Sequence, residues 1–301
     1  MLIEAHRLLG STAVYMAEHH TAERHLRDAL QIYEPEKHRA NVLLYGYDPG
    51  TTCNGYISWA LWLEGKIVEA LAASAASRRL AIESEHAPSL ALAYGWSAVL
   101  HLCTHDLKAL GDVTSKLVGH CEEFGFPHWL ALGKIGRGWF WARTGRVDDG
   151  LESLQVGIEE FRSLWGGFLV SAWLVCLADI LRLKGRFTEA RAALDDSLRM
   201  IERSNERIWK AENHRVCGEV ARDAGEFSEA AAAFELAIHT AREQSARCLD
   251  LRAATSLARL WRDQGKNAEA RDLVAPVYNW FTERLDTPVL EEARKLLQSI
   301  P

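Results

Sequence analysis

Arginines recur at a regular spacing in the second half of the chain, and their chemistry suits the binding of anions. Arg182, Arg222 and Arg262 follow one another at intervals of 40 residues. A guanidinium group presents a planar fork of N–H donors that matches a carboxylate or a phosphate. The predicted binding residues of this stripe are Arg182, Arg215, Arg222, Arg259 and Arg262, with Arg252 close in sequence. The alternative is that these arginines are solvated or paired with acids such as Asp223 and Asp263.

Tryptophans occupy related positions in the first half of the chain. Trp59 and Trp139 lie at the same phase of the 40-residue spacing, and Trp62 follows Trp59 by three residues. Aromatic side chains are frequent anchors in binding surfaces. We therefore expect Trp59, Trp62 and Trp139 to line the apolar end of a groove whose other end carries the arginines. The alternative is that these rings are core residues packed between helices.

No residues of the sequence form a catalytic or metal-binding pattern that we can justify. His101 and His105 share one helical face, which is compatible with zinc, but a third ligand is not evident. The stretch GKIGRG at 133–138 resembles a phosphate loop, yet it lies within a helical pattern and does not follow a strand. The sequence predicts no catalytic residues, no cofactor and no metal.

The elements that position these residues follow from a repeat. The hexads GKIVEA, GRVDDG, GRFTEA, GEFSEA and GKNAEA begin at residues 65, 145, 185, 225 and 265, and HDLKAL fills the gap at 105. Glycine ends a helix readily because it accepts a positive φ, so each hexad predicts a turn between two helices. Seven residues before each hexad stands a small residue, which indicates close contact between the helices. These small residues are Ser58, Ala98, Gly138, Ala178, Gly218 and Ala258.

Helix pairs of this kind cannot bury their apolar faces alone, so consecutive pairs must stack. We therefore predict an all-α fold, an α-α superhelix of about seven antiparallel helix pairs, as one domain over residues 1–301. Its repeats are about 40 residues long, and an irregular loop spans 34–52. Thr287 and Pro288 predict the start of a capping helix over about 288–299.

Composition limits the class of protein. The chain has 301 residues, a net charge of −6 and 48% hydrophobic residues, which is typical of a protein with a sizeable core. The acidic balance argues against a nucleic-acid partner. No apolar run approaches the roughly 20 residues of a membrane span, and the N-terminus does not resemble a signal peptide. Six scattered cysteines are typical of reduced thiols, so we expect a cytoplasmic protein.

The small residues, the joint glycines, and Phe234 with Ala237 resemble the tetratricopeptide pattern, although the period is longer than usual. Longer stretches resemble the C-terminal repeat region of bacterial multidomain signalling proteins that carry a class III adenylate/guanylate cyclase domain and a STAND-type ATPase. These stretches are YGYDPGTTCNGYISWALWLEGK (45–66), FGFPHWLALGKIGRGWFWARTG (124–145), LRAATSLARLWRDQGKNAEA (251–270) and PVYNWFTERLDTPVLEEARKLL (276–297). The resemblance implies a regulatory role, and it implies that the chain is a fragment of a longer protein.

Two functions fit these observations. The first is a non-catalytic scaffold that binds a protein segment or a neighbouring domain and regulates a signalling enzyme. The second is a small-molecule sensor with a ligand inside the superhelix, in a dry cavity near Trp59, Trp62, Trp139 and Trp141. An all-helical enzyme is the third and least favoured possibility. The sequence does not indicate the partner, the ligand or the oligomeric state.

Overall fold

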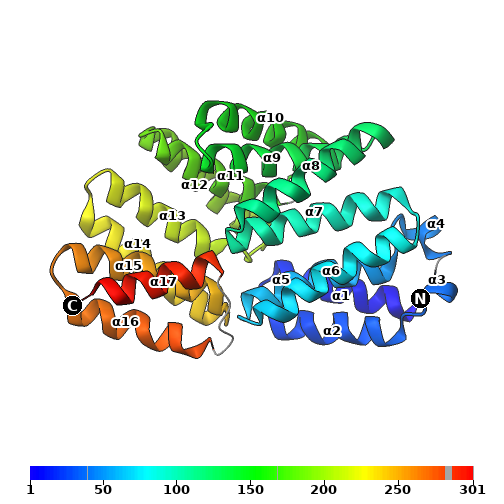
Figure 1. Ribbon diagram of the computed structural model, residues 1–301, viewed down its shortest axis with the longest axis horizontal. Helices are drawn as coiled ribbons and strands as arrows, with labels where there is room; N and C mark the ends of the chain where they lie inside the picture. The colour runs from blue at the N-terminus through cyan, green and yellow to red at the C-terminus, as the bar shows by residue number, and fades with distance from the viewer. Residues whose placement is uncertain (39, 168, 282–286, 301) are drawn as a thin grey trace. The chain divides into compact units, whose positions relative to one another are not determined.

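A computed structural model describes residues 1–38, 40–167, 169–281 and 287–300 of the chain. These residues form the helices α1 to α17, joined by short turns, and contain no strand (Figure 1). The predicted all-α fold of stacked antiparallel helix pairs is confirmed. The chain divides into two compact units, Met1–Gly166 and Gly167–Pro301, which are described separately here.

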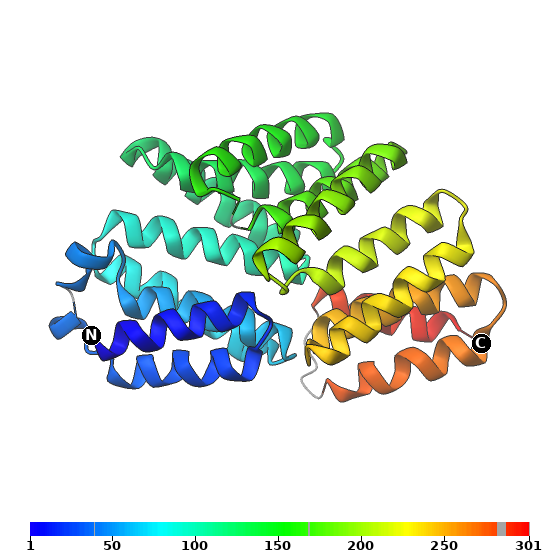
Figure 2. The same ribbon diagram turned by 180° about the vertical axis from the view of Figure 1, so that it is seen from behind.

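The first unit contains four antiparallel helix pairs and two short helices in the connection between the first pair and the second. The pair α1 and α2 lies side by side in both views (Figures 1 and 2). The helices are α1 (Leu2–Tyr15), α2 (His19–Ile32), α3 (Pro35–His38), α4 (Asn41–Tyr45), α5 (Pro49–Leu63), α6 (Ile67–Glu83), α7 (Ala87–Thr104), α8 (Leu107–Phe124), α9 (Pro127–Arg143) and α10 (Val147–Trp165). Each pair after the short helices corresponds to one 40-residue repeat of the sequence.

The second unit contains three further pairs and a closing helix. The helices are α11 (Val170–Leu183), α12 (Phe187–Ser204), α13 (Lys210–Asp223), α14 (Phe227–Glu243), α15 (Arg247–Asp263), α16 (Asn267–Trp280) and α17 (Pro288–Ser299). Phe234 is fully buried between α13, α14 and α15, in a cluster that also includes Leu257 and Leu260. The closing helix α17 packs on α15 and α16, so the predicted capping helix is present.

The turns between paired helices are built as the hexads predict. Gly65 has φ = 89° and Gly145 has φ = 104°, which an L-amino acid side chain disfavours. The backbone N–H of Lys66 reaches back to the carbonyl of Leu61 at 2.8 Å and satisfies the end of α5. His105 occupies the equivalent position of its repeat with φ = 57°. This backbone role explains why a histidine stands where the other repeats have glycine.

The column of small residues marks the closest approach of paired helices, as predicted. A Cβ atom built on Gly138 of α9 would lie 2.7 Å from the carbonyl oxygen of Gly150 on α10. A Cβ atom on Gly150 would lie 2.5 Å from the carbonyl oxygen of Gly138. Because both contacts involve backbone atoms, the two helices touch where neither residue has a side chain.

The segment 34–52, which we expected to be an irregular loop, is partly helical. It contains α3 and α4, and its last four residues form the first turn of α5. Asp48 is the N-cap of α5, and its Oδ1 accepts a hydrogen bond from the backbone N–H of Thr51 at 2.6 Å. Pro49 fits the first helical position because its ring fixes a helical φ. The Asp48–Pro49–Gly50 sequence therefore starts a helix here, where the sequence alone suggested a turn.

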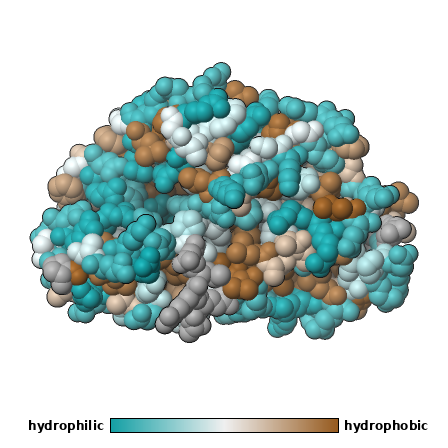
Figure 3. Space-filling view, viewed as in Figure 1, coloured by the Kyte–Doolittle hydropathy of each residue, from teal (hydrophilic) through white to brown (hydrophobic). Residues whose placement is uncertain are grey.

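The outside of the molecule is mostly polar. Hydrophilic residues cover most of the face drawn in Figure 3, and apolar residues occur there in smaller areas. Within the described ranges, no helix is both long enough and apolar enough to cross a membrane. All six cysteines are free; Cys217 is half-buried and the other five are buried.

Candidate functional site

The tryptophans that we expected on an open groove lie in the core of the first unit. Trp59, Trp62 and Trp139 are each no more than 3% exposed. The indole N–H of Trp59 donates a hydrogen bond to the backbone carbonyl of Trp96 at 3.0 Å. The prediction that these three rings line an accessible groove is therefore corrected: the structure buries them between helices. Burial of such large apolar side chains is strongly favourable, which explains their place in the core.

Aromatic rings of successive helices contact one another through this core. Trp59 of α5 meets Trp96 of α7 with ring centroids 4.8 Å apart, and Trp96 meets Trp129 of α9 at 5.0 Å. Both contacts are edge-to-face, the arrangement that aromatic pairs prefer. At one end of the series the indole N–H of Trp129 donates to the hydroxyl of Tyr47 at 3.2 Å. The aromatic residues thus hold the repeats of this unit together.

The arginines lie in the second unit, on the first helix of each pair, and the structure brings them together with carboxylates. Arg182 of α11 pairs with Asp179 of the same helix at 2.8 Å. It also pairs with Asp223 of α13, the next first helix. Arg182 therefore links two successive repeats through a shared ion pair.

Arg215 lies at the centre of a buried charged cluster. Its Nη2 is 2.7 Å from Oε1 of Glu212, and its Nη1 is 3.0 Å from Oε1 of Glu219. Arg252 of α15 pairs with the same Oε1 of Glu212 at 2.8 Å. The hydroxyl of Ser256 donates to Glu219 at 2.6 Å. Two carboxylates of α13 thus bind groups of α15 as well as Arg215, and buried charges are tolerated because each has such partners.

The outer arginines are less buried than this cluster. The side chains of Arg222, Arg259 and Arg262 are 19%, 25% and 31% exposed. Arg222 Nη1 lies 2.7 Å from Oε2 of Glu219, and Arg262 Nη2 lies 2.7 Å from Oδ1 of Asp263. Arg259 pairs with Glu292 of α17. We define Arg182, Arg222, Arg259 and Arg262 with their paired acids as the charged face of α11, α13, α15 and α17.

The cluster changes the acidity of its members. Burial opposes ionisation of Glu219, but the positive charges of Arg215 and Arg222 and the bond from Ser256 hold its pKa below the usual value. The pKa of Asp223 is also lowered, since the hydrogen bonds of Arg222 and Arg182 outweigh its partial burial. The carboxylates of the charged face therefore stay ionised at neutral pH.

Sequence reasoning missed the acidic half of this arrangement. Glu212 and Arg252 each lie 13 residues before a joint glycine, Gly225 and Gly265, so they occupy equivalent positions in successive repeats. Their opposite charges at a separation of 40 residues could have indicated a pair. The structure supports our alternative in part, since it pairs Arg222 with Asp223 and Arg262 with Asp263.

The other sequence candidates do not form a site together. His105 ends α7, and burial lowers the pKa of His101. The stretch 133–138 lies inside α9, as expected from its helical pattern. Neither place offers the strand-to-helix turn of a phosphate loop.

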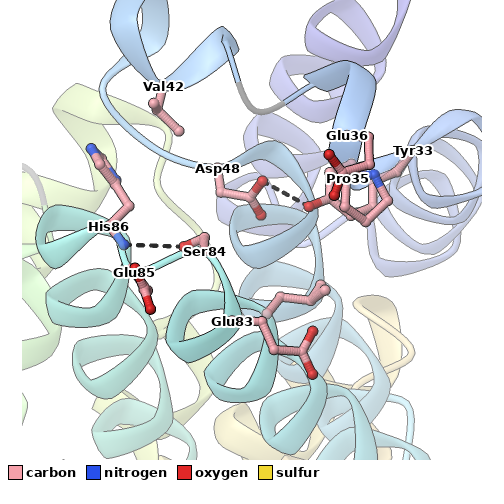
Figure 4. A pocket seen from close by; sticks show the side chains of 10 residues that line it. Tyr33, Pro35, Glu36, Val42, Asp48, Glu83, Ser84, Glu85 and His86 are labelled. Atoms are coloured by element: carbon pink, nitrogen blue, oxygen red, sulfur yellow. Dashed lines mark hydrogen bonds between the residues drawn. The ribbon is translucent and has the colours of Figure 1, made fainter.

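A cavity of about 270 Å³ lies in the first unit, beside the segment 34–48 (Figure 4). Its walls come from the C-terminal ends of α2 and α6, from α3 and α4, and from the start of α7. The hydroxyl of Tyr33 donates to Oδ2 of Asp48 at 2.8 Å across one side of it. The lining residues are Tyr33, Pro35, Glu36, Val42, Asp48, Leu80, Glu83, Ser84, Glu85 and His86. This lining is polar and rich in carboxylates, unlike the dry aromatic cavity that we expected near the tryptophans.

Comparison with known proteins agrees with the helical repeat. Residues 169–243 match the model of the tetratricopeptide repeat family. Among curated proteins, none matches the chain in sequence. The tetratricopeptide pattern thus has direct support in the second unit, where the charged face lies.

Solved structures similar to the chain share its fold at low sequence identity. The apo form of RapI is 12% identical, with a TM-score of 0.59 and coverage of 99% of both chains. A Rap protein complexed with Competence and Sporulation Factor is 11% identical, with a TM-score of 0.59 and coverage of 99% of this chain and 97% of that one. A STAND protein with a tetratricopeptide repeat sensor from Pyrococcus horikoshii is 13% identical, with a TM-score of 0.54. The match to that protein covers 93% of this chain and 46% of the other.

Proposed function

We propose, on the premise that this chain is a tetratricopeptide-like helical repeat, that it is a non-catalytic regulatory scaffold that binds a protein segment or a neighbouring domain. Repeat arrays of this kind present long surfaces built from equivalent positions of successive helices. The charged face carries the proposal, because it places arginines from three successive repeats on their first helices, at Arg182, Arg222 and Arg262.

The proposed ligand of the charged face is a segment with acidic side chains. Ion pairs at partly exposed positions contribute little to stability, so the carboxylates of a partner can replace Asp263 or Glu292 at low cost. The buried cluster around Arg215 holds neighbouring side chains in place, which reduces the entropy lost on binding. A Rap protein of similar fold was solved in complex with Competence and Sporulation Factor, which supports a binding role for this fold.

The wider context of the proposal is a signalling protein in the cytoplasm. The resemblance to repeat regions that follow a cyclase and a STAND ATPase favours this context, and so does the similarity to a STAND protein whose repeat region is named a sensor. We further propose that both units act as one repeat domain over residues 1–301, since the 40-residue period continues from Gly145 to Gly185.

A binding measurement with an acidic peptide tests the scaffold function. We expect fluorescein-labelled octaglutamate to bind the chain, measured by fluorescence anisotropy, and octalysine not to bind. The double variant Arg259→Gln, Arg262→Gln should bind octaglutamate at least about tenfold more weakly, as expected when charge-assisted hydrogen bonds are lost. The matched control is Arg186→Gln, Arg191→Gln, which removes the same charge from α12 of the same unit. Equal weakening in both variants, or no binding of octaglutamate, contradicts the charged face as the binding site.

The cavity beside Tyr33 and Asp48 favours a second candidate function, a small-molecule sensor. Its carboxylates Glu36, Asp48, Glu83 and Glu85 favour a cationic ligand, and its volume of about 270 Å³ suits a small one. A native mass spectrum of the purified chain, compared with its denatured mass, tests this function. A non-covalent excess mass that disappears in the variant Asp48→Asn supports the sensor. The bare mass, unchanged after incubation with a panel of small amines, argues against it.

A further inference from the structure

Two histidines and an aspartate meet between the first two helices, far in sequence from the charged face. The Nδ1 atoms of His6 on α1 and His25 on α2 lie 3.1 Å apart. Oδ2 of Asp28, also on α2, lies 3.7 Å from Nδ1 of His6. One ligand atom from each of the three residues lies within 4.8 Å of the others. These three residues, His6, His25 and Asp28, form the histidine–aspartate cluster.

The packing of α1 on α2 explains why the three side chains meet. His25 and Asp28 are three residues apart on one helix, so their side chains lie on the same face. Gly10 of α1 lies so close to α2 that an added Cβ atom would be 2.6 Å from Cγ of Leu26. This close approach brings the ring of His6, one turn before Gly10, against the ring of His25, with centroids 5.2 Å apart.

The distances within the cluster suit a tetrahedral metal ion. Zinc binds histidine nitrogen and carboxylate oxygen at about 2.0–2.2 Å, so adjacent ligand atoms of a tetrahedral site are about 3.3 Å apart. The observed separations of 3.1 Å and 3.7 Å lie on either side of that value. Two imidazoles and one carboxylate are donors that zinc takes in protein sites. The geometry therefore needs only small side-chain movements to hold the ion.

A second cluster of the same unit has similar residue types but already contains a cation. His20, Glu23 and Glu64 also bring three ligand atoms together. The ammonium group of Lys66 lies 2.6 Å from Glu23 and 2.8 Å from Glu64, where a metal ion would have to bind. In contrast, within the part of the chain that the structure describes, the ion pair of Asp28 is with His6. The histidine–aspartate cluster thus has donors without a competing ammonium or guanidinium group.

We propose that the histidine–aspartate cluster binds a divalent transition-metal ion, zinc in the first instance. Nδ1 of His6, Nδ1 of His25 and a carboxylate oxygen of Asp28 are the three protein ligands. Coordination requires the lone pairs of both Nδ1 atoms, so each ring carries its proton on Nε2 when the metal is bound. The side chains of His6 and Asp28 are 23% and 41% exposed, so water can reach the fourth position.

The bound ion would link α1 to α2 and stabilise the N-terminal pair. A ligand that binds the folded chain and not the unfolded chain raises the apparent stability. The metal would thus act on the repeat that begins the first unit. This inference is independent of the proposed scaffold function, because the charged face lies in the other unit.

Titration of the full chain with Co²⁺, followed by competition with Zn²⁺, tests the site. We expect one equivalent of Co²⁺ to produce the visible absorption of a tetrahedral ion, and one equivalent of Zn²⁺ to remove it. The variants His25→Ala and Asp28→Asn should each lower the affinity at least about tenfold, as expected for loss of one of three ligands. The control His20→Ala removes a histidine of the second cluster from the same helix and should leave the affinity unchanged.

Folding of each variant is checked by far-UV circular dichroism, and Asp28→Asn keeps the shape of a partly exposed side chain. Zn²⁺ should raise the Tm of the natural chain and of His20→Ala, and leave that of Asp28→Asn unchanged. Absence of one-equivalent binding in the natural chain overturns the proposal. Unchanged affinity in both His25→Ala and Asp28→Asn also overturns it, as does a loss of affinity only in His20→Ala.

Discussion

Arg252 of α15 donates a hydrogen bond from Nη2 to Oε1 of Glu212 on α13 at 2.8 Å, and both side chains are more than nine-tenths buried. The two residues occupy equivalent positions of successive repeats, 40 residues apart. Glu212 also accepts two hydrogen bonds from Arg215, so a single carboxylate serves two guanidinium groups. This pair therefore couples two helix pairs of the second unit through buried charge.

Removal of that carboxylate should destabilise the chain severely. Glu212→Gln leaves two buried arginines without their shared acid, and breaking a buried pair typically costs about 3–5 kcal/mol in the free energy of unfolding. The control Glu189→Gln breaks an exposed pair with Arg186 and should change stability too little to measure. Urea denaturation of both variants measures the difference. Similar, small effects in both would show that the buried pair is not important for stability.

Stability should fall as the pH is lowered from about 6.5 towards 4, because of buried histidines. Burial, with the nearby charge of His20, lowers the pKa of His19 from 6.5 to about 4. Between these values the unfolded chain binds a proton at this residue and the folded chain does not, so acid favours unfolding. The stabilisation is complete above the unfolded pKa and is lost as the pH falls to the folded pKa.

The variant His19→Gln isolates this contribution. It should reduce the slope of unfolding free energy against pH by up to about 1.4 kcal/mol per pH unit in that range. His214, whose pKa burial lowers to about 4, keeps part of the slope in the variant. The control His239→Gln changes an exposed histidine paired with Glu243. An identical pH profile for the natural chain and His19→Gln would refute the assignment.

The contact between α9 and α10 should not tolerate a methyl group. In Gly138→Ala the new Cβ meets backbone atoms of Gly150 and Leu154, each at 2.7 Å, so the helices must separate. We expect a loss of about 1–3 kcal/mol, which is typical of overpacking. Gly119→Ala in α8 is the matched control, since its Cβ meets nothing within 4 Å. The control should stabilise by up to about 1 kcal/mol through helix propensity. Thermal unfolding of both variants measures the contrast, and equal Tm changes would contradict it.

The cysteines of the folded chain should react slowly with thiol reagents. Burial raises the pKa of Cys53 and Cys121 to about 12, and that of Cys217 to about 11. At a pKa of about 11, roughly one thiol in a thousand is ionised at pH 8, and the thiolate is the reactive form. Cys217 is the most exposed cysteine, so it should react first, about tenfold faster for each pH unit between 7 and 9.

Alkylation with iodoacetamide, followed by peptide mass mapping, tests the order of reaction. All six cysteines should react quickly in concentrated urea, because unfolding removes the burial. Rapid modification of Cys53 or Cys121 in the folded chain at neutral pH would show that these thiols are accessible.

The sequence predicted the helix pairs well because their signals are local. A glycine at 65, 145, 185, 225 and 265 permits a positive φ, and a small residue seven positions earlier permits close helix contact. Both effects act within one pair, so they can be read from neighbouring residues. The segment 34–52 was less predictable, since Asp48 and Pro49 suit a turn and a helix start equally well.

The candidate site was only half predictable. The 40-residue spacing identified Arg182, Arg222 and Arg262, but the choice between solvent, ligand and internal acid depends on how the helices of different repeats face one another. The tryptophans show the same limit, because a large aromatic ring suits a core as well as a binding surface. The structure buries Trp59 and Trp139, and it places His6 beside His25, a pair whose spacing carries no motif.

The sequence by itself therefore determined the helices, their pairing, their 40-residue repeat and the closing helix. These depend on backbone preferences and on contacts within about 40 residues, which repeat along the chain. The tertiary structure alone decided which arginines are paired, which aromatic rings are covered, and which histidines meet. Those outcomes depend on packing between helices and on the burial of each side chain, because charge and desolvation act through space and do not follow the order of residues.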